Sequence, residues 1–323
     1  MTEPLSMHTP ARVLVAGVAT LSPADPVLRP ALGLAERMDA ELHLVHAYVP
    51  DAEVLSRYAH QGYTGADPAR LYADALQARL EGEAYALSRD ARVVCHVHPG
   101  RPEAVLPQVA RETGADVLLL APTRRGRVAG ALLGTTAQHL LRHASLPVLV
   151  LHGEPAFHRV LLTADLSPES LSAHARGLAL AVALAAGPHP ALRALHVVPP
   201  AWLEETAELA DDDVNAAMSQ LVDFLAAHPL DRPTPAACVR FGEPAQAIVH
   251  EARAWSADLL VVGTHGRRGA ARLLLGSVAE SVLGHAPCSV LVVPTALAGA
   301  AAGGSGIAVG ALPVVGPPQP VAP

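Results

Sequence analysis

Three glycines and a serine in the C-terminal half of the chain have the spacing of a phosphate-binding loop. Two residues separate Gly263 from Gly266, and nine more separate Gly266 from the pair Gly276 and Ser277. Glycine reaches positive φ and has no Cβ, so backbone N–H groups in such a loop can approach an anion closely. Gly276 and Ser277 are expected to begin a helix, whose first N–H groups lack intrahelical partners and favour negative charge. The spacing therefore predicts a phosphate cradle, with turn-forming glycines as the alternative.

The cradle contains no lysine, because all 23 basic residues of the chain are arginine. Arg267, Arg268 and Arg272 lie between the second and third glycines. We interpret them as solvated loop residues, since arginines occur at nearby positions in a related segment that lacks the glycines. Asp165 supplies a carboxylate at the end of an apolar run and is followed by Ser167. It could contact a ligand or cap the helix expected from Pro168.

The chain contains the same domain twice. Residues 100–151 reappear without a gap as residues 242–293, and only the later copy keeps all three glycines. The matching positions of the first copy are Ala121, Arg124, Gly134 and Thr135. Aligning residues 12–18 with residues 159–165 places Val18 opposite Asp165. The repeat predicts that only the second copy has a complete site.

Each copy alternates short apolar runs with longer helical patterns, which is typical of βαβ units and a parallel sheet. In the second copy we expect strands at 160–164, 192–198, 236–240, 259–263 and 289–293. We expect helices at about 168–185, 201–227, 244–255 and 277–285. The predicted fold is α/β: two tandem, doubly wound, Rossmann-like domains, each with a five-stranded parallel sheet covered by helices on both faces. Ligands of such sheets bind beyond the carboxyl ends of the strands, where the strand order reverses.

Length and composition limit the function classes. The 323 residues suffice for two domains, which we place at 1–152 and 153–297, followed by a flexible Ala/Gly/Pro-rich tail at 298–323. A formal charge of −7 and a pI near 6.2 argue against nucleic acid or an acidic membrane surface as partner. The three cysteines are scattered without a disulfide or zinc pattern. We expect a cytoplasmic protein with neither a signal peptide nor a membrane span.

The positions of the histidines indicate structural roles rather than catalytic ones. His46 and His196 recur at the same strand end, as do His143 and His285 near the last helix of each copy. His96 and His98 share one face of a strand, but no third metal ligand is indicated. No nucleophile with an adjacent base can be identified, so we expect no catalytic residues and a binding module rather than an enzyme.

The combination Gly-x2-Gly-x9-Gly-Ser, preceded by Asp-x-Ser after the first strand and His-Val at the end of the second, resembles the universal stress protein family. The resemblance spans Arg12 to Pro294 and indicates a tandem, two-domain member with an adenine nucleotide hydrolase-like fold. It implies ATP, with or without Mg²⁺, as the ligand of the second domain. Asp165 would contact ribose or a cation, and Val197 would contact adenine through its backbone. The phosphates would be held by Gly263, Gly266, Gly276 and Ser277.

The resemblance also implies pairing through the last strands, residues 148–151 and 290–293. The two domains would then form an internal pseudo-dimer, and a homodimer is left open. The function expected is a nucleotide-responsive binding or regulatory module in the stress response. A slow ATPase or autophosphorylating enzyme and a nucleotide-independent scaffold are the alternatives. The protein partner, the stress served and the role of the tail are not indicated by the sequence.

Overall fold

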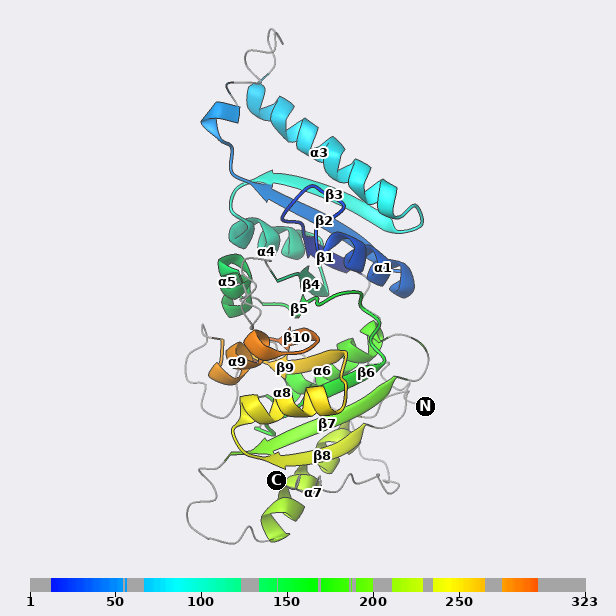
Figure 1. The fold of residues 1–323 in the computed structure, drawn as a ribbon, viewed down its shortest axis with the longest axis vertical. Helices are drawn as coiled ribbons and strands as arrows, with labels where there is room; N and C mark the ends of the chain where they lie inside the picture. Colours follow the sequence, from blue (N-terminus) through cyan, green and yellow to red (C-terminus); the bar gives the residue numbers. More distant parts are fainter. Residues whose placement is uncertain are drawn as a thin grey trace, which may run out of the picture. The chain divides into compact units, whose positions relative to one another are not determined.

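The computed structural model describes residues 13–54, 56, 67–122, 134–143, 145–167, 170–185, 187, 190–199, 211–228, 235–264 and 275–295 (Figure 1). The chain forms two compact units that divide between Pro155 and Ala156. The predicted tail at 298–323, together with Arg124, Gly266 and the three loop arginines, lies outside the described residues. No described helix combines the length and the apolar character needed to cross a bilayer. The pairing predicted for the last strands stays a prediction.

The first unit alternates strands and helices and has a parallel sheet in the order β3-β2-β1-β4-β5. Its elements are β1 (Val13–Gly17), α1 (Leu28–Met38), β2 (Glu41–Tyr48), α3 (Pro68–Leu87), β3 (Arg92–Pro99), α4 (Pro102–Glu112), β4 (Val117–Leu120), α5 (Thr135–His143) and β5 (Val148–Val150). Strands β4 and β5 are buried along their whole length, as expected for apolar strands of a parallel sheet that is covered on both faces.

The second unit repeats this order as β8-β7-β6-β9-β10. Its elements are β6 (Arg159–Thr163), α6 (Leu171–Leu184), β7 (Ala191–Val198), α7 (Asp211–Ala227), β8 (Ala236–Phe241), α8 (Pro244–Ala254), β9 (Leu259–Gly263), α9 (Ser277–His285) and β10 (Ser289–Val293). Each strand boundary lies within one residue of its predicted position. The doubly wound, five-stranded parallel sheet predicted for each copy is confirmed.

Helices cover both faces of the second sheet. Parallel crossovers are right-handed, so the reversal of direction after β8 places α8 and α9 on the face opposite α6 and α7 (Figure 1). Helix α6 approaches the sheet closely at Gly177, where a Cβ would lie 3.0 Å from side-chain atoms of both Val261 and Val293. The reversal falls between β6 and β9, which is where the ligand crevice of this fold lies.

The strand register corrects one alignment of the two copies. The amide of Asp116 donates to the carbonyl of Val13, and that of Asp258 donates to the carbonyl of Arg159. Asp116 and Asp258 occupy the same place in the ungapped repeat, so Val13 corresponds to Arg159. The alignment of Arg12 with Arg159 was therefore wrong by one residue. It rested on the shared letters Arg-Val-Leu, whereas register depends on which residues pair across strands.

This correction changes the counterpart of Asp165 from Val18 to Ala19. Neither residue has a carboxylate, so the predicted loss of that group from the first copy is unaffected. Asp116 and Asp258, which directly precede β4 and β9, also contact the first strand of their unit through their side chains. Their carboxylates accept hydrogen bonds from backbone N–H groups at the start of the first strand, Val13 and Arg159 respectively, at 3.1 and 2.9 Å.

The described cysteines are all unpaired. Burial raises the pKa of Cys95 to about 11 and that of Cys288 to about 12, and it also raises the pKa of Cys238. A thiol with such a pKa stays protonated at neutral pH and is a poor nucleophile. Cys238 and Cys288 are buried in the core of the second unit, and Cys95 is half-buried in β3.

Candidate functional site

The candidate site of the second unit lies at the carboxyl ends of its strands. Asp165 follows β6, Val197 is near the end of β7, and Gly263 ends β9. Gly276 and Ser277 lie at the start of α9. The fold thus brings these five predicted residues to one edge of the sheet, although they come from four separate segments. Asp165, Val197, Gly263 and Gly276 are half-buried, and Ser277 is exposed.

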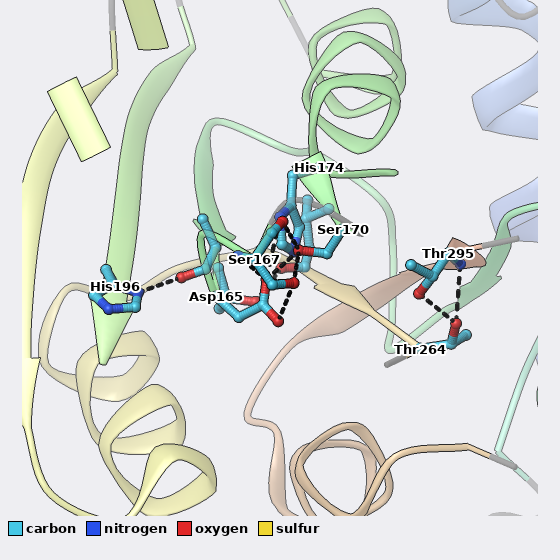
Figure 2. Close-up of polar contacts among 10 residues, drawn as sticks. Asp165, Ser167, Ser170, His174, His196, Thr264 and Thr295 are labelled. Atoms are coloured by element: carbon cyan, nitrogen blue, oxygen red, sulfur yellow. Dashed lines mark hydrogen bonds and ion pairs between the residues drawn. The ribbon is translucent and has the colours of Figure 1, made fainter. Parts of the chain in front are cut away.

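The Asp165 carboxylate is held by its own loop (Figure 2). The Ser167 backbone N–H donates to Oδ1 at 3.2 Å, and the Ser167 hydroxyl lies 3.1 and 3.0 Å from the two carboxylate oxygens. The Ser170 hydroxyl donates to Oδ1 as well, and the two serine hydroxyls lie 2.8 Å apart. Both serines are buried, with exposed fractions of 3% and 1%. This bonding orients the carboxylate before any ligand arrives.

The loop geometry bears on the alternative that Asp165 caps the following helix. Helix α6 begins at Leu171, its N-cap is Ser170, and that cap makes no side-chain hydrogen bond to the helix. The carboxylate instead accepts from Ser167, two residues on, as in an Asx turn. Leu166, between Asp165 and Ser167, has a φ of 56°. This left-handed conformation is unfavourable in free energy for any residue other than glycine. Positive φ outside glycine is frequent at functional sites, which agrees with a ligand-binding loop.

His174 lies behind the carboxylate and was missed by the sequence argument. Its Nδ1 is 3.8 Å from Oδ1 of Asp165, and this nitrogen is buried without a hydrogen-bond partner in the described structure. Burial lowers the pKa of His174, the charge of Asp165 opposes that shift, and His196 reinforces it. The imidazole is therefore neutral at neutral pH. The spacing from Asp165 to His174 matches no simple motif.

The backbone of Val197 is directed toward the crevice. The carbonyl of Leu195 accepts the N–H of Ala164 at 2.9 Å, so Leu195 directs its polar groups toward β6. Alternate residues of a strand direct their N–H and C=O groups to the same neighbour, so those of Val197 point the same way. Strand β6 ends at Thr163, before it could pair with them. This position suits recognition of a planar base through main-chain donors and acceptors.

Thr264, the residue after Gly263, connects the two ends of the glycine loop. Its carbonyl accepts the N–H of Gly276 at 2.7 Å, and its own N–H donates to the carbonyl of Val293 at 3.0 Å. The contact sets the position of the α9 N-terminus beside the end of β9. The next amides of α9, those of Ser277, Val278 and Ala279, have no acceptor among the residues that the structure describes. They are the orphan donors that an anion can satisfy.

In the first unit, the amides of the corresponding loop donate to a carboxylate within that loop. Asp25, which is 3% exposed, accepts from the amides of Ala19 and Thr20 at 3.0 and 2.7 Å and from that of Val27 at 2.9 Å. The Thr20 hydroxyl also donates to it, at 3.1 Å. Ala19 stands where the second unit has Asp165. The first unit therefore has no carboxylate at the position of Asp165, and the amides of its loop donate to Asp25 instead.

The recurring histidines have structural contacts, as predicted. A ring nitrogen of His46 lies 3.0 Å from the carbonyl of Val18, and one of His196 lies 2.7 Å from that of Ala164. His143 and His285 contact the carbonyl one turn earlier in their helices. His96 lies 2.8 Å from His43, which approaches Glu41. Among the described residues, no group of three or more potential ligands is arranged to hold a metal ion.

The comparison with known families agrees with the duplication and with the fold. The sequence model of the universal stress protein family matches residues 11–152 and again residues 156–294. The chain belongs to the universal stress protein family. Universal stress protein Rv2005c of Mycobacterium tuberculosis is 31% identical over 229 residues, which cover 66% of this chain and 73% of that protein. A universal stress protein of Mycolicibacterium smegmatis is 29% identical over 309 residues, covering 87% and 96% respectively.

Solved structures show the same universal stress protein fold. A protein of unknown function from Pseudomonas aeruginosa, PA1789, aligns with a TM-score of 0.61 and 20% identity over 88% of this chain and 92% of its own. A universal stress protein from Archaeoglobus fulgidus aligns with a TM-score of 0.57 and 16% identity over 88% and 98%. At these identities the likeness concerns the fold. The assignment of ligand contacts in this universal stress protein rests on its own residues.

Proposed function

We propose that the second unit of this universal stress protein binds ATP, one molecule per chain, and acts as a nucleotide-responsive binding or regulatory module in the cytoplasm. One observation carries the proposal: at the crevice edge of the second unit, an oriented carboxylate, Asp165, shares the edge with the open N-terminus of α9. A nucleotide needs both features, a hydrogen-bond acceptor for its sugar and donors for its phosphates.

Each predicted residue has a contribution that its position supports. The Asp165 carboxylate would accept hydrogen bonds from ribose hydroxyls, and the Val197 main chain would bind the adenine edge. The phosphates would be bound by backbone N–H groups of the loop between Gly263 and Gly276 and of the start of α9, with the Ser277 hydroxyl as a further donor. The N–H groups of Thr264 and Gly276 are not part of this set, because they donate to carbonyls within the protein. Mg²⁺, when bound with the nucleotide, would neutralise part of the phosphate charge. The two units differ at the loop after their first strand: the second has the carboxylate of Asp165 there, whereas the first has Ala19, whose amide donates to Asp25. This difference supports a single site per chain.

We propose binding without appreciable hydrolysis. Phosphoryl transfer needs an oriented water and charge neutralisation along the breaking bond. In the described part of the site, Asp165 already accepts hydrogen bonds from Ser167 and Ser170, and His174 is buried behind it. Contacts that bind ground-state phosphates do not by themselves accelerate the transfer. A slow ATPase and a nucleotide-independent scaffold are the outcomes that experiment must separate from this proposal.

A matched pair of variants tests the site in the full-length chain. Gly276→Arg places a side chain at the start of α9, and Gly134→Arg makes the same change at the matching position of the first copy. The φ and ψ of Gly276, −62° and 147°, suit any residue, so the variant should fold. Isothermal titration with ATP should show about one site per chain in the wild type. We expect Gly276→Arg to lose that site and Gly134→Arg to keep it.

The nucleotide content of freshly purified protein, read by mass spectrometry, gives an independent test. An adenine nucleotide retained by the wild type and by Gly134→Arg, but not by Gly276→Arg, supports the proposal. Two sites per chain, or loss of binding only in Gly134→Arg, would place the ligand elsewhere. Absence of any nucleotide and of any titration signal would favour the scaffold.

A further inference from the structure

Thr264 joins three segments of the second unit through both its backbone and its side chain. It is 6% exposed and lies between the end of β9, the start of α9 and the residues that follow β10. Its hydroxyl Oγ1 accepts the N–H of Thr295 at 3.1 Å and lies 3.2 Å from the Thr295 hydroxyl. Figure 2 shows this pair of threonines facing each other. Together with the backbone bonds to Val293 and Gly276, these contacts form a clamp at the two ends of the glycine loop.

The first copy cannot form this clamp. Pro122 occupies the position of Thr264 in the ungapped repeat, and Gly153 aligns with Thr295 when the repeat is extended by two residues. Proline has no backbone N–H to donate and no hydroxyl, and glycine has no side chain. The copy that has lost two motif glycines has therefore also lost the donor, the hydroxyl and its partner. The clamp and the glycine pattern occur together in the second copy.

The clamp acts on the orientation of the α9 amides. The bond between the Thr264 carbonyl and the Gly276 N–H fixes where α9 begins relative to the end of β9. The side-chain contacts with Thr295 hold the Thr264 peptide in place from the opposite side. A donor set that is fixed before binding loses less conformational entropy when an anion arrives. The benefit falls on the phosphate part of a ligand, because Asp165 and Val197 lie in other segments, after β6 and near the end of β7.

We propose that Thr264 is a positioning residue that makes the site selective for ligands with a phosphate chain over the corresponding nucleoside. This inference rests on the proposed nucleotide site of the second unit. Thr264 acts through the amides of α9 and through Gly276, and its own polar atoms are used within the protein. Its removal should therefore weaken binding of ATP while binding of adenosine, which lacks phosphates, stays nearly unchanged.

The test compares Thr264→Val with Thr264→Ser in the full-length chain. Valine keeps the branched shape and the backbone N–H but removes the hydroxyl, whereas serine restores the hydroxyl. Titration should show ATP affinity lowered about tenfold in Thr264→Val, adenosine affinity changed less than about twofold, and near wild-type ATP affinity in Thr264→Ser. Thr163→Val is the matched control, because it removes the buried hydroxyl bond to the Val261 carbonyl on the same sheet. Thr163→Val should leave the ratio of the affinities for ATP and adenosine unchanged.

Hydrogen exchange of the Gly276 amide tests the clamp without any ligand. We expect faster exchange in Thr264→Val than in the wild type, and protection restored in Thr264→Ser. If Thr264→Val fails to fold, Thr295→Val removes the partner hydroxyl and should lower ATP affinity by about threefold. The positioning role alone is refuted if Thr264→Val loses equal affinity for ATP and for adenosine. It is also refuted if the wild type binds ATP and Thr264→Val binds it with the same affinity. A wild type that binds no ATP refutes the proposed function as well.

Discussion

Replacing Asp165 by asparagine removes the charge at the candidate site and keeps the shape of the side chain. The Asp165 side chain is 27% exposed. Its carboxylate accepts hydrogen bonds from the Ser167 amide and from the hydroxyls of Ser167 and Ser170. Asparagine can accept with its single oxygen, and the serine hydroxyls can rotate to bond each other, since they lie 2.8 Å apart. We therefore expect Asp165→Asn to fold.

The expected cost follows from the strength of these contacts. A hydrogen bond to a charged acceptor contributes about 1.5–3 kcal/mol, against about 0.5–1.5 kcal/mol for a neutral one. Weakening the bonds from Ser167 and Ser170 should lower the free energy of unfolding by about 2 kcal/mol. The same weakening of one bond to the ribose should raise the Kd for ATP by about tenfold, which corresponds to about 1.4 kcal/mol.

The assay pairs isothermal titration with urea denaturation followed by circular dichroism, and Asp25→Asn is the control. Asp25 is also a loop carboxylate after the first strand of its unit, and it accepts from Ala19, Thr20 and Val27. Both variants should lose stability, whereas only Asp165→Asn should lose ATP affinity. An Asp165→Asn protein that binds ATP as tightly as the wild type would refute the assignment of the carboxylate to the ligand. So would an equal loss of affinity in Asp25→Asn.

Three further predictions address the loop, the chemistry and the pH dependence. Gly266→Arg copies Arg124 of the first copy and should abolish ATP binding while circular dichroism stays unchanged; retained binding would show that the cradle is misassigned. Incubation with Mg-ATP should release phosphate at a negligible rate, and a turnover that disappears in Asp165→Ala while ATP binding survives would establish an enzyme instead. Burial lowers the pKa of His174 below its ordinary value of 6.5, so the unfolded chain binds a proton there before the folded chain does as pH falls. The stability contributed by neutral His174 is therefore complete above pH 6.5 and is lost as pH falls from 6.5 toward the lowered pKa. Melting temperatures of His174→Asn should fall less than those of the wild type between about pH 7.5 and about pH 5.5, and parallel curves would exclude His174 as the cause.

The second unit illustrates how far sequence patterns reach. Strand β9 has the predicted bounds, because an unbroken apolar run between turn residues is buried on both faces of a sheet. Helix α9 also has the predicted bounds and begins directly after Gly276. Helix α6 was expected from about Pro168 and begins at Leu171. The difference arises in the loop after Asp165, where Ser167 and Ser170 bond the carboxylate and Ser170 becomes the N-cap. Such local side-chain bonds compete with helix formation and leave little trace in periodicity.

The sequence by itself determined the duplication, the order of strands and helices, and the segments that meet at the crevice edge. These follow from apolar periodicity and from glycine spacing, which are local properties of the chain. It also showed that the first copy lacks two of the three motif glycines and the carboxylate. The position of Asp165, Val197, Gly263 and Gly276 at one edge then follows from the doubly wound topology.

Only the tertiary structure decided which residues support those groups. Three features depend on hydrogen bonds between residues that sequence patterns do not connect. They are the equivalence of Val13 and Arg159 in the two copies, the hydrogen bonds from the first loop to Asp25, and the contact of Thr264 with Thr295. A polar residue can find its partner at many sequence distances, so composition and spacing do not identify it. Burial adds the final constraint, because a polar group removed from water must bond whatever partner the fold brings within reach.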